Sequence, residues 1–139
     1  MLFRSKKRVR INNWNLVDSS APHIVGAHLL RQDRSVLYEL AQSRSLWDRR
    51  IAVLATFAFI RADDFADTLK LTEQLLADEH DLMHKACGWM LREVGKRNQP
   101  ALEKFLRRHH PVMPRTMLRY AIERFTPARR KAYLAGKIR

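Results

Sequence analysis

The sequence predicts an all-α fold in which helix pairs stack into a helical-repeat array, an α-α superhelix. Apolar residues recur at helical spacing along almost the whole chain, and no alternating β-branched run of the strand type occurs. The five prolines, at positions 22, 100, 111, 114 and 127, all fall at expected helix starts or in connections, where their missing N–H costs least. With 139 residues and 46% hydrophobic content, we expect one domain over 1–139 with a sizeable core.

After an N-terminal helical segment, the first expected pair joins a short helix over 34–43 to a longer helix over 46–61. Asp33 or Ser35 can cap the short helix, and the Ser43–Ser45 break separates it from its partner. The apolar positions at helical spacing are Val36, Leu37, Leu40 and Ala41 in the first helix and Leu46, Trp47, Ile51, Leu54, Ala55 and Ala58 in the second.

The second and third pairs repeat this arrangement. Asp63–Asp64 marks the start of a helix over 65–77, and a longer helix over 81–97 follows it. The third pair covers 100–109 and 114–125. The apolar positions that predict these helices include Phe65, Leu69, Leu75, Leu82, Ala86, Trp89, Leu102, Phe105, Met117, Leu118 and Ile122.

Similar pairs at a spacing of about 30–40 residues are typical of helical-repeat arrays, whose second helices line one concave face. Each second helix carries a cation near its start, and cations at equivalent points along one face would follow a phosphate backbone. These starts read Trp47-Asp48-Arg49-Arg50, Met83-His84-Lys85 and Pro114-Arg115-Thr116. An ordinary helical bundle with chance similarity is the alternative.

Positive charge is concentrated at the two ends of the sequence. Residues 85–139 hold 15 Lys and Arg against three Glu, a net charge of +12, while residues 1–10 contribute +5 and residues 11–84 contribute −4. A long basic surface is the usual electrostatic footprint of nucleic-acid binding. A solvated basic face, or association with RNA or ribosomes without chemistry, would carry the same charge.

The cellular compartment follows from cysteine content and hydropathy. Cys87 is the single thiol, which excludes an intrachain disulfide and indicates a reducing compartment. No apolar run approaches the roughly 20 residues of a membrane span, and no secretory apolar region follows the basic start. We therefore expect a cytoplasmic, nucleoid-associated protein with no membrane partner.

Four motifs are ordered and well separated along the chain. They read Trp14-Asn15-Leu16-Val17-Asp18-Ser19, Leu46-Trp47-Asp48-Arg49-Arg50, Lys85-Ala86-Cys87-Gly88-Trp89-Met90-Leu91-Arg92-Glu93 and Met113-Pro114-Arg115-Thr116-Met117-Leu118-Arg119-Tyr120. Together they resemble the bacterial DNA alkylation repair glycosylases of the HEAT-like-repeat, AlkD type over nearly the whole chain. The resemblance implies base excision of cationic N3- and N7-alkylated purines from double-stranded DNA, without a metal or another cofactor.

The resemblance also assigns roles to individual residues. It places the family's catalytic carboxylate on Asp18, its two cleft indoles on Trp14 and Trp89, and its cleft arginine on Arg50. The other cations that we expect to bind DNA are Arg49, Lys85, Arg92, Arg115 and Arg119.

The sequence departs from the family pattern in two ways. Asn15 stands where the family often has an acid. Family members also carry further helical repeats before the Trp14 motif, whereas thirteen residues precede it here. We therefore expect either the C-terminal part of a longer protein or a short relative, which as an isolated chain would form a homodimer or be marginally stable.

The chemistry of the lesion explains why these residue types would be needed. An N3- or N7-alkylated purine carries a positive charge, so it is a good leaving group and needs no general acid. The Asp18 carboxylate would stabilise the oxocarbenium-like sugar and position the attacking water. Trp14 and Trp89 would hold the cationic nucleotide by cation–π attraction, about 0.5–2 kcal/mol per contact. Arg50 would hold a phosphate beside the lesion.

Each of these residues also has a structural interpretation. A Trp at helical spacing is usually part of a core, as we expect for Trp47. Asp18 could cap the next helix. Arg49 and Arg50 could be a solvated pair, and Arg49 competes with Arg50 for the phosphate.

Two function classes therefore stay open. One is a lesion-specific glycosylase, and the other is a non-catalytic DNA-binding or scaffold module; release of free alkylated base separates them. A metal site is disfavoured. His80 and His84 have the i, i+4 spacing of such a site, but the Glu of an H-E-x-x-H motif is missing and no third ligand is evident.

Overall fold

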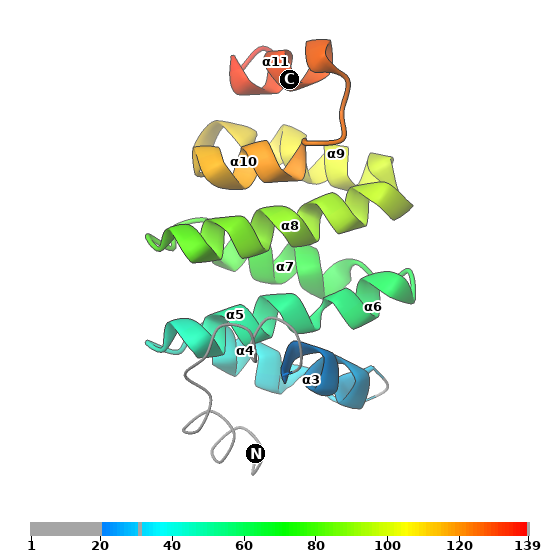
Figure 1. Cartoon of the computed structure of the whole chain (residues 1–139), viewed down its shortest axis with the longest axis vertical. Coiled ribbons are helices and arrows are strands. Elements are labelled where there is room, and N and C mark those ends of the chain that lie inside the picture. The colour runs from blue at the N-terminus through cyan, green and yellow to red at the C-terminus, as the bar shows by residue number, and fades with distance from the viewer. Residues whose placement is uncertain (1–20, 31, 139) are drawn as a thin grey trace.

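The computed structural model describes residues 21–30 and 32–138, and every regular element in these ranges is a helix. The helices stack into an elongated array with their axes across its length (Figure 1). The elements are α3 (Ala21–Leu29), α4 (Ser35–Ala41), α5 (Leu46–Ala55), α6 (Phe57–Arg61), α7 (Ala66–Gln74), α8 (Asp81–Arg97), α9 (Gln99–His109), the 3₁₀ helix η1 (His110–Val112), α10 (Arg115–Ala121) and α11 (Pro127–Leu134).

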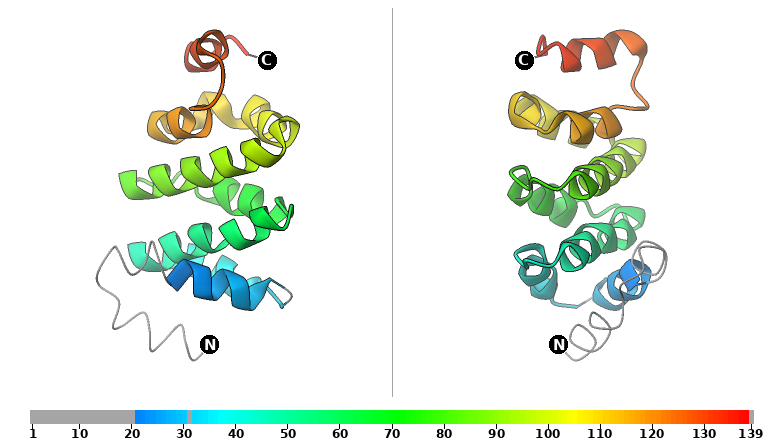
Figure 2. Two further views of the ribbon diagram at one scale, coloured as in Figure 1. Left: turned by 45° about the vertical axis from the view of Figure 1, so that its right-hand side comes forward. Right: turned by 60° about the vertical axis from the view of Figure 1, so that its left-hand side comes forward.

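The array has two layers. In Figure 1 the front layer holds α3, α5, α6, α8 and α10, and the back layer holds α4, α7 and α9. Within the front layer α5 packs on α3 and α8, and α8 packs closely on α10; α8 also packs on α7 and α9 of the back layer. The two further views in Figure 2 show the same two columns of helices. The predicted all-α repeat array is confirmed.

Polar side chains fix several helix starts. Ser45 precedes α5 and its hydroxyl accepts from the Asp48 N–H at 3.5 Å. Asn98 does the same for α9, accepting from the Ala101 N–H at 3.1 Å next to Pro100. These acceptors satisfy N–H groups that have no partner inside the helix, so each helix begins where the sequence supplies a cap.

The structure differs from the predicted elements in three places. The single helix expected over 46–61 is two helices, because the chain tightens at Thr56, whose hydroxyl and N–H both donate to the Val53 carbonyl. The helix expected over 65–77 ends at Gln74 and the one expected over 114–125 ends at Ala121, since turns follow both. The sequence analysis also missed α11, which begins at Pro127 behind the Thr126 cap.

Two glycines allow neighbouring front-layer helices to approach closely. A Cβ on Gly88 would lie 2.5 Å from the Tyr120 Cβ and 2.7 Å from the Met117 carbonyl oxygen, so α8 crosses α10 at this point. A Cβ on Gly26 of α3 would lie 2.9 Å from the Ala58 Cβ. Both crossings require the absence of a side chain.

The hydrophobic core is continuous from α3 to α11, between the two layers. It includes Tyr133 of α11, which is 1% exposed and packs edge-on against the His110 ring. Among the helices that the structure describes, none combines the length and the apolar character that a membrane span requires. The stacked layers therefore leave the outward faces of the front-layer and back-layer helices as the extended surfaces on which a partner could bind.

Candidate nucleic-acid interface

Aromatic side chains of three front-layer helices, α3, α6 and α8, form a strip. The Trp89 ring of α8 lies 6.2 Å from the Phe57 ring of α6, and the Phe57 ring lies 6.4 Å from the His23 ring of α3, centroid to centroid. Trp89 and Phe57 are half-buried and His23 is exposed. The Arg61 guanidinium lies 5.8 Å from the Phe57 centroid. We call His23, Phe57 and Trp89 the aromatic strip; it can present π faces to a cationic or stacking ligand.

A cationic hollow lies on the same layer, between α8 and the end of α10. Arg92, Lys96, Glu123 and Arg124 line this open hollow of about 480 Å³. Trp89, Arg92 and Lys96 are spaced at i, i+3 and i+7 along α8, so the hollow continues the side of the helix that carries the indole.

Two of these cations are held by carboxylates of the protein. Arg92 forms an ion pair with Glu123, and the Lys96 ammonium lies 2.9 Å from the Glu93 carboxylate. Arg124 forms no ion pair within the described ranges. The predicted DNA-binding residue Arg92 therefore lies beside Trp89 but shares its charge with Glu123.

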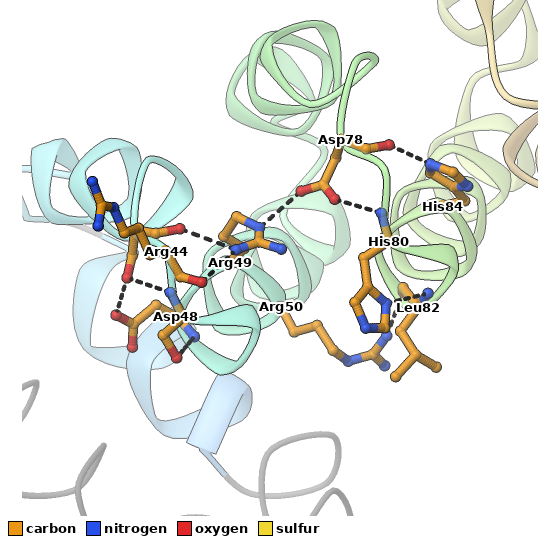
Figure 3. A network of polar contacts seen from close by, with 10 residues as sticks. Arg44, Asp48, Arg49, Arg50, Asp78, His80, Leu82 and His84 are labelled. Atoms are coloured by element: carbon orange, nitrogen blue, oxygen red, sulfur yellow. Dashed lines mark hydrogen bonds and ion pairs between the residues drawn. The ribbon is translucent and has the colours of Figure 1, made fainter.

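Arg49 and Arg50 lie near the start of α5 and face the turn that precedes α8 (Figure 3). The Arg49 Nε donates to the Asp78 carboxylate at 2.8 Å, and its Nη1 donates to the Ser43 and Arg44 carbonyls at 3.1 and 3.0 Å. Arg50 is 6% exposed, and its Nη1 donates to the Leu82 carbonyl at 2.5 Å. Both arginines join one helix pair to the next, and a phosphate contact for either one stays a prediction.

The two spaced histidines contribute to the same turn (Figure 3). The Leu82 N–H donates to the His80 Nδ1 at 3.2 Å, which caps α8, and the His84 Nε2 lies 2.5 Å from the Asp78 carbonyl oxygen. Across residues 21–30 and 32–138, no group of three or more His, Cys, Asp or Glu side chains could hold a metal ion. His80 therefore caps α8 and His84 contacts the loop before this helix, and these two contacts explain the spacing of the histidines.

The remaining predicted cations fall on α8 and α10. The Lys85 ammonium lies 3.3 Å from the Asp81 carboxylate on the same helix. The Arg115 Nη1 donates to the Leu134 carbonyl at 2.7 Å, so this side chain anchors α11 to α10. Arg119 is exposed and forms neither an ion pair nor a hydrogen bond with another described residue. Asp18 and Trp14, the proposed carboxylate and first indole, lie outside the described residues.

Cys87 has no catalytic environment. It lies on the buried side of α8, and burial raises the pKa of its thiol to about 12. A thiol with so high a pKa stays protonated at neutral pH, so it is a poor nucleophile.

The sequence analysis did not find Phe57, His23 or Arg124 as site residues. Phe57 belongs to an apolar run, where an aromatic residue is usually part of the core. A comparison of equivalent positions on successive second helices is the one sequence signal that could have paired Phe57 with Trp89.

The fold and this face define a helical-repeat protein with an aromatic and cationic surface on its front layer. The family model described as DNA alkylation repair enzyme matches residues 2–125. The chain therefore belongs to the DNA alkylation repair enzyme family, which indicates DNA as its partner. No curated protein and no solved structure gives a significant match to the chain.

Proposed function

We propose that this protein excises cationic N3- and N7-alkylated purines from duplex DNA by hydrolysis of the N-glycosidic bond. The single observation that carries the proposal is the aromatic strip. Trp89 is half-buried beside Phe57, 6.2 Å away, on a layer whose neighbouring hollow is lined by three cations and one carboxylate. A half-buried indole near a cationic surface suits a nucleotide that carries a positive charge on its base and negative charge on its phosphates.

The proposed carboxylate is close in sequence to the aromatic strip, which supports a role for it there. Asp18 is three residues before Ala21, where α3 begins, and three residues of chain span at most about 11 Å. His23, two residues into α3, lies in the aromatic strip. A carboxylate at Asp18 would stabilise the developing sugar cation, and the alkylated base would depart as a neutral leaving group.

The cations that retain capacity for phosphate would position the duplex. On the front layer these are Arg119 and Arg124, which form no ion pair with a described residue. Arg92 is paired with Glu123, and Lys96 is paired with the half-buried Glu93. Phosphate contacts fix orientation and carry no sequence information. We therefore expect binding that depends on DNA charge, with the lesion selected at the aromatic strip.

Single-turnover release of 7-methylguanine from a methylated duplex tests the carboxylate. We expect Asp18→Asn to slow release while DNA affinity stays nearly unchanged, because the charge acts mainly in the transition state. Glu79→Gln is a matched control, since Glu79 is an exposed acid outside the strip and the hollow. Wild-type release no faster than spontaneous depurination would favour the non-catalytic DNA-binding module, and wild-type speed in Asp18→Asn would remove that carboxylate from the mechanism.

The indole has its own test. Trp89→Leu keeps an apolar side chain against Phe57 but removes the π face, so we expect the preference for methylated over unmodified duplex to fall about 2- to 30-fold. Trp47→Leu is the matched control because Trp47 is a half-buried core-packed Trp of α5. An equal loss of preference in both variants would indicate a stability effect and count against the role of Trp89.

A further inference from the structure

The back layer carries a second cationic surface, formed by Lys70 of α7 and by Lys104, Arg107 and Arg108 of α9. All four side chains are exposed. The opposite side of α9 is buried in the core through Leu102, Phe105 and Leu106. Because α7 and α9 lie behind α8 (Figure 1), this surface and the aromatic strip belong to different layers. We call these four residues the back cationic surface.

Two open hollows run along the back cationic surface. One, of about 340 Å³, lies between α7 and α9 and is lined by Lys70, Lys104 and Arg108 together with Leu69 and Phe105 among others. The other, of about 610 Å³, is lined by Pro100, Glu103, Lys104, Arg107 and Arg108. Lys104 and Arg108 line both, so the two hollows form one continuous cationic surface.

The carboxylates next to this surface are already occupied. Glu103 accepts from Arg129 and from the Tyr133 hydroxyl of α11, and Glu73 lies 3.0 Å from the His109 Nε2. Lys104, Arg107 and Arg108 form no ion pair or hydrogen bond with any residue that the structure describes. The surface therefore keeps an uncompensated charge of three on α9, whereas Lys85, Arg92 and Lys96 on α8 are each paired with a carboxylate.

We propose that the back cationic surface is a second nucleic-acid site, which binds the sugar–phosphate backbone of a DNA segment separate from the one on the front layer. Lys104, Arg107 and Arg108 are spaced at i, i+3 and i+4, so their charges lie along one side of α9, and Lys70 extends them to the neighbouring helix. A row of charges across two helices suits a linear polyanion more than a single small anion. The forked guanidinium groups also match phosphate geometry.

The row of unpaired cations on α9 favours a nucleic acid over an acidic amphipathic peptide. Such a peptide needs an apolar groove for its anchors. Here Phe105 is 6% exposed, and the His109 ring lies over it at 4.6 Å between centroids. Ala66, Leu69 and Ala101 also line this hollow and leave some apolar surface in its floor, so the choice of a nucleic acid rests on the row of unpaired cations. We accordingly expect binding without sequence preference.

Two faces on opposite layers predict that one protein holds two duplexes. The experiment uses undamaged duplexes of about 15 base pairs, long enough to cover α9 but short enough that one duplex cannot reach both layers. Sedimentation gives the protein-to-duplex ratio. We expect one protein to two duplexes for the wild type at low salt, and one to one for Lys104→Ala/Arg108→Ala. Alanine keeps the helix propensity of α9.

The salt dependence of binding gives the expected size of the effect on affinity. Two phosphate contacts contribute about 1.8 to the log–log salt slope, so these two contacts alone should lower the affinity of the wild type for its second duplex about tenfold between 50 and 200 mM salt. Arg44→Ala/Lys137→Ala removes the same charge at two exposed positions outside both hollows and should keep the one-to-two ratio. Lys104→Arg/Arg108→Lys should keep it as well.

The proposal is overturned by a wild-type ratio of one to one at every salt concentration, or by a one-to-two ratio that survives in Lys104→Ala/Arg108→Ala. An assembly of two proteins with two duplexes would show that self-association of the protein, and not a second site, brings the duplexes together. The surface would be reassigned to an acidic protein partner if the wild type binds a poly-glutamate peptide but no second duplex, and if Lys104→Ala/Arg108→Ala abolishes the binding of the peptide. None of these outcomes depends on base release, so they are independent of the proposed excision activity.

Discussion

Replacing Gly88 by alanine should separate α8 from α10 and destabilise the array. The new Cβ would lie 2.5 Å from the Tyr120 Cβ and 2.7 Å from the Met117 carbonyl oxygen, where ordinary contact begins at 3.4 Å. Both atoms are fixed to the α10 backbone and cannot rotate away. The two helices would therefore have to move apart by about 0.9 Å along this contact, and a gap of that size forfeits a quarter to a half of each affected dispersion contact.

The free-energy change is the balance of two opposing effects. Overpacking of this kind costs about 1–3 kcal/mol, while alanine gains about 1 kcal/mol over glycine inside a helix. We expect the overpacking to prevail and the free energy of unfolding to fall by up to about 2 kcal/mol. For a chain of this size each kcal/mol lowers Tm by about 3–5 °C.

Gly95 supplies a matched control in the same helix. A Cβ there would meet the Cδ2 end of the Leu102 side chain, which can turn away, and Leu102 offers no other atom closer than 3.5 Å. Gly95→Ala should therefore be neutral or slightly stabilising through helix propensity. Urea unfolding followed by circular dichroism measures both variants. A Gly88→Ala protein at least as stable as Gly95→Ala would refute the close crossing of α8 and α10.

Two further predictions concern charge. Burial alone would raise the pKa of Glu103, but hydrogen bonds from Arg129, Tyr133 and Gln99 outweigh it and hold that pKa below the ordinary 4.5. The ionised Glu103 therefore stabilises the docking of α11 above pH 4.5, and this stabilisation is lost as the pH falls through its lowered pKa. In the wild type, the hydrogen-exchange protection of α11 should drop in acid. In Glu103→Gln, this protection should be low at all pH values. The affinity for DNA should fall steeply as the salt concentration rises. Arg119→Ala should weaken binding to every sequence about equally and lower the log–log salt slope by about 0.9. A titration in which the affinity does not change with salt would reject this prediction.

The sequence predicted the helices that combine strong periodicity with a clear start signal. The expected 81–97 helix matches α8, and the expected 100–109 helix matches α9 to within a residue. α11 was missed although Thr126 and Pro127 form a start signal, because Tyr133 is its one fully buried residue and the apolar pattern is therefore weak. The break at Thr56 depends on a local hydroxyl bond that periodicity does not reveal.

The candidate site was less predictable because it depends on contacts between repeats. Trp89 was assigned to the cleft by resemblance, and the structure places it beside Phe57, 32 residues earlier, which in turn lies beside His23 of α3. The sequence also identified Arg49 and Arg50 as cations on one helix. Their protein partners, the Asp78 carboxylate and the Leu82 carbonyl, come from the next helix pair, so only the folded array shows how they are engaged.

The charged side chains that the structure describes fall into two groups, those that form ion pairs between repeats and those that do not. Most ion pairs of the described residues join positions about one repeat apart, with separations of 26 to 36 residues; they are Arg34–Asp64, Arg34–Asp67, Arg49–Asp78, Arg92–Glu123, Arg97–Asp63, His109–Glu73 and Arg129–Glu103. In a repeat array stability depends on interfaces between neighbours, so these pairs hold consecutive repeats in register. The half-buried Arg49–Asp78 pair should contribute more than the exposed Arg97–Asp63 pair. Net charge alone therefore overstates the binding surface, since every cation used between repeats is neutralised before DNA arrives. Arg119 and Arg124 in front and Lys104, Arg107 and Arg108 behind form no ion pair with a described residue, so a polyanion gains most from contact with them.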